Sequence, residues 1–188
     1  FLNQMDAEGL NVTARSYKAT IRNFSYCVGA ALAQANAIMT GWHIGAGELE
    51  ECDRGTKRAA FVGVCVAVCM ETAIVLGSGF IMPLFTDNPE MTALVRKLLA
   101  IDSVLEIGRV TILVFGQALN TSGVAVFPAV IAAVFMFVFA VGGTWLFGIS
   151  MGLMAVGAYI GLASDECVRA VGMVWRWKTG KWRTKKLV

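Results

Sequence analysis

The stretch Ile101–Gly123, IDSVLEIGRVTILVFGQALNTSG, places charges inside an otherwise apolar helical sequence. Asp102, Glu106 and Arg109 recur at helical spacing, so they share one face of the predicted helix. That face continues with polar side chains, whereas the remaining faces are mainly Val, Ile, Leu and Phe. Ionisable groups in a membrane-spanning helix usually face a bundle interior or a water-filled path. Whether this helix crosses a membrane therefore decides both the fold and the role of the charges.

The composition is that of a polytopic membrane protein. Of the 188 residues, 57% are hydrophobic and 15% are charged, whereas soluble domains average about 25% charged residues. The net charge of +3 is too small to indicate a nucleic-acid partner. The single histidine and the five cysteines form no metal-binding pattern. No metal site is predicted, and no enzyme is predicted because no nucleophile–base pair or phosphate loop occurs.

Five apolar stretches, each long enough to cross the hydrocarbon layer as a helix, follow one another along the chain. Turn signals rich in Pro, Gly, Asn and Asp separate them, and strand patterns are absent. We predict an all-α polytopic membrane protein, in which residues 1–11 end a preceding helix and loop, 12–173 form the transmembrane lobe, and 174–188 form a tail. The five transmembrane helices are expected at about 12–42, 59–80, 91–119, 124–147 and 149–173.

The tail sets the predicted orientation. Residues 174–188 combine tryptophans with many Lys and Arg residues, as expected for an interfacial aromatic belt beside a positive-inside flank. We therefore expect a cytoplasmic C-terminus. The connector at 45–58, which is rich in charge, and the turn at 120–123 should then lie on the same side of the membrane, and the acidic turn at 82–90 outside.

Four motifs resemble those of the MATE (multidrug and toxic compound extrusion) transporters. GWHIGAGELEECDRGTKRAA at 41–60 resembles a glycine-rich connector of that family, and MPLFTDNPEM at 82–91 resembles its external turn. LEIGR at 105–109, followed by QALNTSG at 117–123, resembles its third-to-fourth helix junction. SDECVRAVGMVWRWKTGKW at 164–182 resembles the C-terminal end of one bacterial group. The motifs occur in family order, cover nearly the whole chain from Val12, and indicate the C-terminal half.

The resemblance implies two six-helix lobes around a central cleft, and this chain would hold five helices of the last lobe. It also implies an antiporter in the plasma (inner) membrane that exports organic cations and other amphipathic drugs by alternating access, in exchange for H⁺ or Na⁺ and with no other cofactor. The expected partners are the lipid bilayer, small organic cationic or amphipathic substrates and the missing N-terminal lobe, but no nucleic acid. Symmetry-related repeats of this kind place their sites at the repeat interface.

Glu106 is the main candidate for cation coupling. It lies four residues from Asp102, close enough for the two carboxylates to repel each other when both are ionised. Burial and a like charge favour a protonated carboxyl group, whereas the nearby Arg109 favours the ionised form. Glu106 could thus load and release a proton while Arg109 tunes it, or the two could form a structural ion pair. The acid expected from the resemblance aligns near Arg109, so the site would be a variant.

Other polar residues are candidates for the substrate cleft, although polar and small residues also make ordinary contacts between helices and basic ones snorkel to the interface. Glu71, the one acid in the predicted second helix, could be a functional group or lie near an aqueous surface. The cleft candidates are Arg22, Asn36, Gln117 and Asn120.

Two alternative functions remain at this point. A lipid or lipid-linked-oligosaccharide flippase of the same superfamily would need a larger and more basic cleft, which Arg15, Lys18, Arg22 and Arg109 favour weakly. A truncated, non-transporting membrane protein is the other alternative.

Overall fold

The computed structural model describes residues 10–81, 89–143, 145–147 and 154–184. No strand occurs in these ranges, which confirms the predicted all-α class. A π-helical stretch, Met136–Val141, follows the fourth helix, and a 3₁₀ turn, Lys181–Thr184, follows the fifth. The helices are α1 (Leu10–Gly45), α2 (Leu49–Ile81), α3 (Pro89–Thr121), α4 (Val126–Phe135) and α5 (Met154–Lys178).

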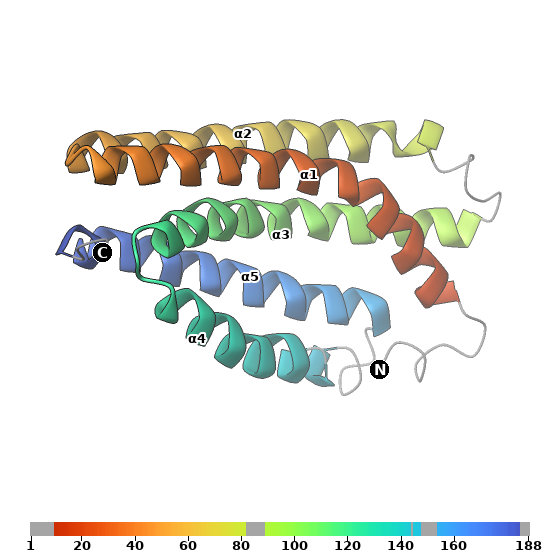
Figure 1. Ribbon diagram of the computed structural model, residues 1–188. Helices are drawn as coiled ribbons and strands as arrows, with labels where there is room; N and C mark the ends of the chain where they lie inside the picture. Colours follow the sequence, from red (N-terminus) through yellow and green to blue (C-terminus); the bar gives the residue numbers. More distant parts are fainter. Residues whose placement is uncertain (1–9, 82–88, 144, 148–153, 185–188) are drawn as a thin grey trace.

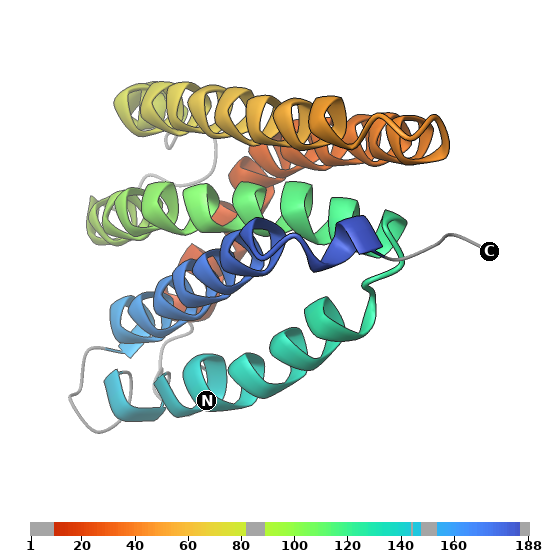
Figure 2. The ribbon, with the colours of Figure 1, turned by 90° about the vertical axis from the view of Figure 1, so that its left-hand side faces the viewer.

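Helix α3 forms the centre of the bundle. It packs against α1, α2 and α5, and the ribbon shows it between the α1–α2 pair and α5, with α4 on the far side (Figures 1 and 2). Its residues Val110, Val114, Ala118 and Leu119 are fully buried. Because three neighbours pack around α3, Asp102 and Glu106 of the charged stripe are enclosed by protein.

One helix among the described residues satisfies the length and hydropathy expected of a membrane span on its own. It is Leu49–Gly77 within α2, with a mean hydropathy of 2.3. The apolar segment Val126–Val138 is shorter. Charged side chains of α3, including Asp102, Glu106 and Arg109, lower the mean hydropathy of that helix. Hydropathy alone therefore identifies fewer spans than the predicted five.

The predicted connector at 45–58 is wrong in extent, because α2 begins at Leu49 rather than at 59. Only Ala46–Glu48 forms the turn, in which Gly47 has a positive φ of 77° that glycine adopts without strain. The charged residues that follow form the first turns of α2. Ion pairs at helical spacing, Arg54–Glu51 and Lys57–Asp53, favour that conformation.

Two helices end more than three residues away from their predicted C-terminal ends. The segment predicted as one helix at 124–147 is a continuous α-helix only from Val126 to Phe135, and wider π turns begin at Met136. Helix α5 continues past 173 to Lys178 because Trp177 packs against the core. The predicted segment 1–9, most of the turn at 82–90 and the helix start at 149 lie outside the described residues.

The α1–α2 turn, the α3–α4 link and the C-terminal tail lie at the same end of the bundle, as the topology predicts (Figure 1). Ion pairs from Arg183 to Glu50 and to Asp53 join the tail to the start of α2. The reading of the tail as an aromatic belt is wrong for two of its tryptophans. Trp177 and Trp182 are buried, and Trp175 is 60% exposed.

Helices α3 and α5 approach each other closely at Gly108. A methyl group there would lie 3.0 Å from the carbonyl carbon of Glu166 and 3.1 Å from the amide nitrogen of Cys167. We expect Gly108→Ala to lower the free energy of unfolding by about 1–3 kcal/mol, because the backbone of α5 must move. Gly116→Ala is the matched control, since nothing lies within 4 Å of its added methyl group. Thermal melting in detergent would compare them, and equal stabilities would contradict the close contact.

Candidate functional site: a buried carboxylate cluster

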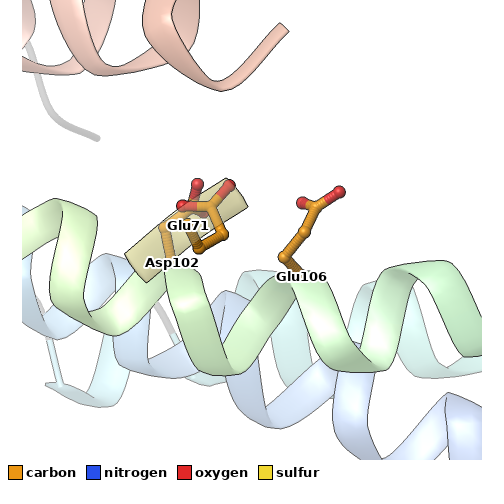
Figure 3. Close-up of side chains that lie close together, drawn as sticks. All are labelled: Glu71, Asp102 and Glu106. Carbon is orange, nitrogen blue, oxygen red and sulfur yellow. The ribbon is translucent and has the colours of Figure 1, made fainter. Parts of the chain in front are cut away.

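Three carboxylates meet between α2 and α3. Glu71 comes from α2, and Asp102 and Glu106 come from successive turns of α3 (Figure 3). One carboxyl oxygen of each lies within 4.8 Å of the others. The exposed fractions are 1% for Glu71 and 0% for Asp102 and Glu106. We call these three residues the carboxylate cluster.

The guanidinium of Arg109 connects the cluster to α5. Its Nη1 donates to Glu106 Oε2 at 3.0 Å. Its Nε and Nη2 both donate to Glu166 Oε1, at 3.2 and 3.0 Å. The predicted Glu106–Arg109 pair therefore exists, and Arg109 bridges two acids on different helices. The fixed fork of the guanidinium suits such a bridge better than an ammonium group would.

A second arginine extends this network along α5. Arg169 Nη2 lies 2.7 Å from Asp165 Oδ2 and 4.0 Å from Glu166 Oε1. Asp165 is buried, and Arg169 and Glu166 are mostly buried. Glu106, Arg109, Glu166 and Arg169 thus alternate in charge from the cluster to α5. Such alternation lowers the cost of burying each charge.

Arg169 also lines a pocket between α3, α4 and α5. This pocket has a volume of about 460 Å³, and its wall is mainly apolar. Gln117 and Asn120, two of the predicted cleft residues, contribute amide groups to it. Along the α3 stripe, Asp102 and Glu106 therefore meet α2, whereas Gln117 and Asn120 line the pocket against α4 and α5.

Asn36 lies elsewhere, in a pocket of about 220 Å³ between α1 and α2. The hydroxyl oxygens of its neighbours Thr40 and Thr56 lie 3.5 Å apart. The structure therefore does not bring Asn36 together with Gln117 and Asn120. The side chain of Arg22 lies outside the described part of the chain.

The sequence indicated Asp102, Glu106 and Arg109 but left two partners unassigned. Glu71 is separated from Asp102 by a turn and most of a helix, and no local pattern joins them. Glu166 lies 57 residues from Arg109. The one signal in the sequence was a run of charges, Asp165, Glu166 and Arg169, at the end of a glycine-rich apolar stretch.

The cluster has the chemistry of a site for a small cation. Carboxylate oxygens are the ligands that hard metal cations prefer, and neighbouring carboxylates also share protons readily. Like charges repel strongly in a buried setting, so uptake of a proton or a metal cation relieves the repulsion among the three. Its location between helices, rather than at a surface, suits a group that binds and releases a cation as helices move.

A comparison with protein families identifies the family of this chain. A model of the MatE family matches residues 9–146. The chain belongs to the MatE family. The match includes all of α1 to α4, and hence the three carboxylates and Arg109. The family expected from the resemblance is thereby confirmed.

A related protein gives a second line of support for this MatE chain. This chain is 28% identical over 185 residues to a protein of Bacillus subtilis (strain 168) described as the uncharacterized transporter YisQ. The alignment covers 98% of this chain and 40% of that protein. The chain therefore spans less than half the length of this relative. Both comparisons point to a transporter family.

Proposed function

We propose that this chain forms part of the C-terminal half of a cation-coupled antiporter that exports organic cations and other amphipathic compounds by alternating access. The observation that carries the proposal is the carboxylate cluster of Glu71, Asp102 and Glu106, enclosed between two helices of a MatE transporter. In the proposed cycle, H⁺ or Na⁺ binds the cluster in one conformation and leaves it in the other. A ligand changes the balance of two conformations only by its difference in affinity for them.

The pocket beside Gln117, Asn120 and Arg169 is the proposed place for part of the substrate. Its apolar wall and convergent polar groups are typical of small-molecule sites. A lipid flippase is less well supported. It would need a basic cleft, yet Arg109 is engaged by Glu106 and Glu166. The side chains of Arg15, Lys18 and Arg22 lie outside the described residues.

The proposed orientation is that of a multi-pass protein of the plasma (inner) membrane with a cytoplasmic C-terminus. The basic tail and the start of α2 are joined by Arg183, and both carry many Lys and Arg residues. Basic segments that gather at one end of a helical bundle favour that end as the cytoplasmic one.

The test is Glu106→Gln in the full-length transporter that contains this chain. The amide keeps the shape of the side chain but cannot bind a proton or balance a metal cation. We expect the initial rate of ethidium efflux from cells to fall at least about tenfold, and its dependence on external pH and Na⁺ to disappear. Glu71→Gln should change the same two quantities in the same direction, because both acids belong to one site.

Glu51→Gln is the control for this experiment. Glu51 forms an exposed pair with Arg54 at the start of α2, far along the helix from Glu71. The efflux rate and ion dependence of the Glu51→Gln variant should equal those of the wild type at equal amounts of protein in the membrane. An ion dependence that persists unchanged in Glu106→Gln would contradict the proposed coupling site.

A further inference from the structure

The ion pair between Arg109 of α3 and Glu166 of α5 stands immediately behind the carboxylate cluster. One guanidinium serves two acids here: Nη1 contacts Glu106 at 3.0 Å, and Nε and Nη2 contact Glu166 at 3.2 and 3.0 Å. Arg109 is 15% exposed and Glu166 14%. Charges that are so little hydrated influence each other strongly. The charge of Glu166 therefore determines how much of the positive charge of Arg109 acts on Glu106.

The fold holds Glu166 in this place from two sides. Gly108 lets the backbone of α5 come so close to α3 that the carbonyl carbon of Glu166 would lie 3.0 Å from an added Cβ. On its own helix, Glu166 has Arg169 at 4.0 Å, and Arg169 is held by Asp165 at 2.7 Å. The acid is thus fixed by close helix packing and by charge together. If Glu166 served only to hold α3 and α5 together, the close packing at Gly108 would be sufficient.

We infer that Glu166 is a positioning residue for cation coupling: it neutralises and orients Arg109 so that the carboxylate cluster can bind its cation. The inference rests on the proposed function. With Glu166 ionised, Arg109 faces one acid on each side, and its positive charge is partly cancelled. Without the negative charge of Glu166, the full positive charge of Arg109 acts on Glu106 and repels an incoming proton or metal cation.

Other charged and titratable groups surround this pair in the described part of the chain. They remain unchanged in the experiment below, so a change in ion dependence reports on Glu166. They are Glu71 on α2, Asp102 and Glu106 on α3, and Asp165, Cys167 and Arg169 on α5.

The experiment measures ethidium efflux by the full-length transporter as a function of Na⁺ concentration at fixed pH, and of pH without Na⁺. For Glu166→Gln we expect the concentration of the coupling ion that gives half-maximal efflux to rise at least about threefold. The maximal rate at saturating ion should stay near that of the wild type. The reason is that the three carboxylates that bind the cation are intact.

A double variant separates this role from a purely structural one. In Glu166→Gln with Arg109→Gln, the positive charge is removed together with its neutralising partner, and the two amides can still hydrogen bond. We expect the half-maximal ion concentration to return to the wild-type value or below it. A structural clamp predicts instead that the double variant is at least as impaired as the single one.

The matched control is Glu50→Gln. Glu50 also pairs with an arginine of another segment, Arg183, but at the exposed end of the bundle away from the cluster. It should leave the ion dependence unchanged. An unchanged half-maximal ion concentration in Glu166→Gln, with loss only of thermal stability, would overturn the inference and leave the proposed function intact. Wild-type efflux that responds to neither Na⁺ nor pH would instead overturn the proposed function itself.

Discussion

Replacing Arg109 with alanine is expected to lower the free energy of unfolding of the transporter by about 3–5 kcal/mol. The substitution removes the one guanidinium that both Glu106 and Glu166 contact, and it leaves the two acids largely buried. Removing one member of a buried ion pair is costly because the remaining charge loses its compensation and cannot recover its hydration. Here two acids are affected, so the loss should fall at the upper part of that range.

The measurement is thermal melting of the purified full-length protein in detergent, followed by far-UV circular dichroism. Arg54→Ala serves as the control, because the Arg54–Glu51 pair is more than half exposed on both sides. Such surface pairs contribute about 0–1 kcal/mol. Equal melting temperatures for Arg109→Ala and Arg54→Ala would show that the α3–α5 bridge does not stabilise the fold.

Replacing Trp177 with alanine should also cost about 3–5 kcal/mol of unfolding free energy. The indole is 1% exposed. It stacks on Trp182 with ring centroids 4.3 Å apart and meets Phe115 edge-on at 6.0 Å. Its Nε1 donates to Asp53 Oδ1 at 2.8 Å. The substitution therefore removes apolar burial, two aromatic contacts and a hydrogen bond between α5 and α2.

Trp175→Ala is the matched control for this prediction. Trp175 is two residues away on the same helix but is 60% exposed, so its loss should cost less than about 1 kcal/mol. The stability of Trp177→Phe should lie between those of the two alanine variants, because it keeps an aromatic ring but loses the hydrogen bond to Asp53. Melting curves in detergent would rank the three variants. A Trp177→Ala protein as stable as Trp175→Ala would show that the tail is not part of the core.

The stripe on α3 illustrates how far local pattern reaches. Asp102, Glu106 and Arg109 lie three or four residues apart, and helix geometry alone places them on one face. That reasoning correctly anticipated the Glu106–Arg109 contact. It assigned no partner from α5, because a contact over 57 residues depends on how two helices pack. The same reasoning predicts one cleft along the whole stripe, whereas Gln117 and Asn120 line a pocket that is separate from the carboxylate cluster.

The ends of the helices show the same limit. The sequence predicts a connector for the charged, glycine-containing run at 45–58, yet its acidic and basic residues are spaced for helical ion pairs. The tryptophans of the tail were read as a membrane belt. Two of them are buried because Gly180, with a positive φ of 67°, turns the chain so that Trp182 returns onto Trp177.

By itself, the sequence determined the all-helical membrane class, the MatE family and the shared face of Asp102, Glu106 and Arg109. These follow from composition, ordered motifs and the fixed pitch of a helix, which are all local properties. Only the tertiary structure decided that Glu71 completes the carboxylate cluster and that Glu166 shares Arg109. The physical reason is that contacts between helices depend on their relative rotation and depth, which are set by the packing of all of their faces together.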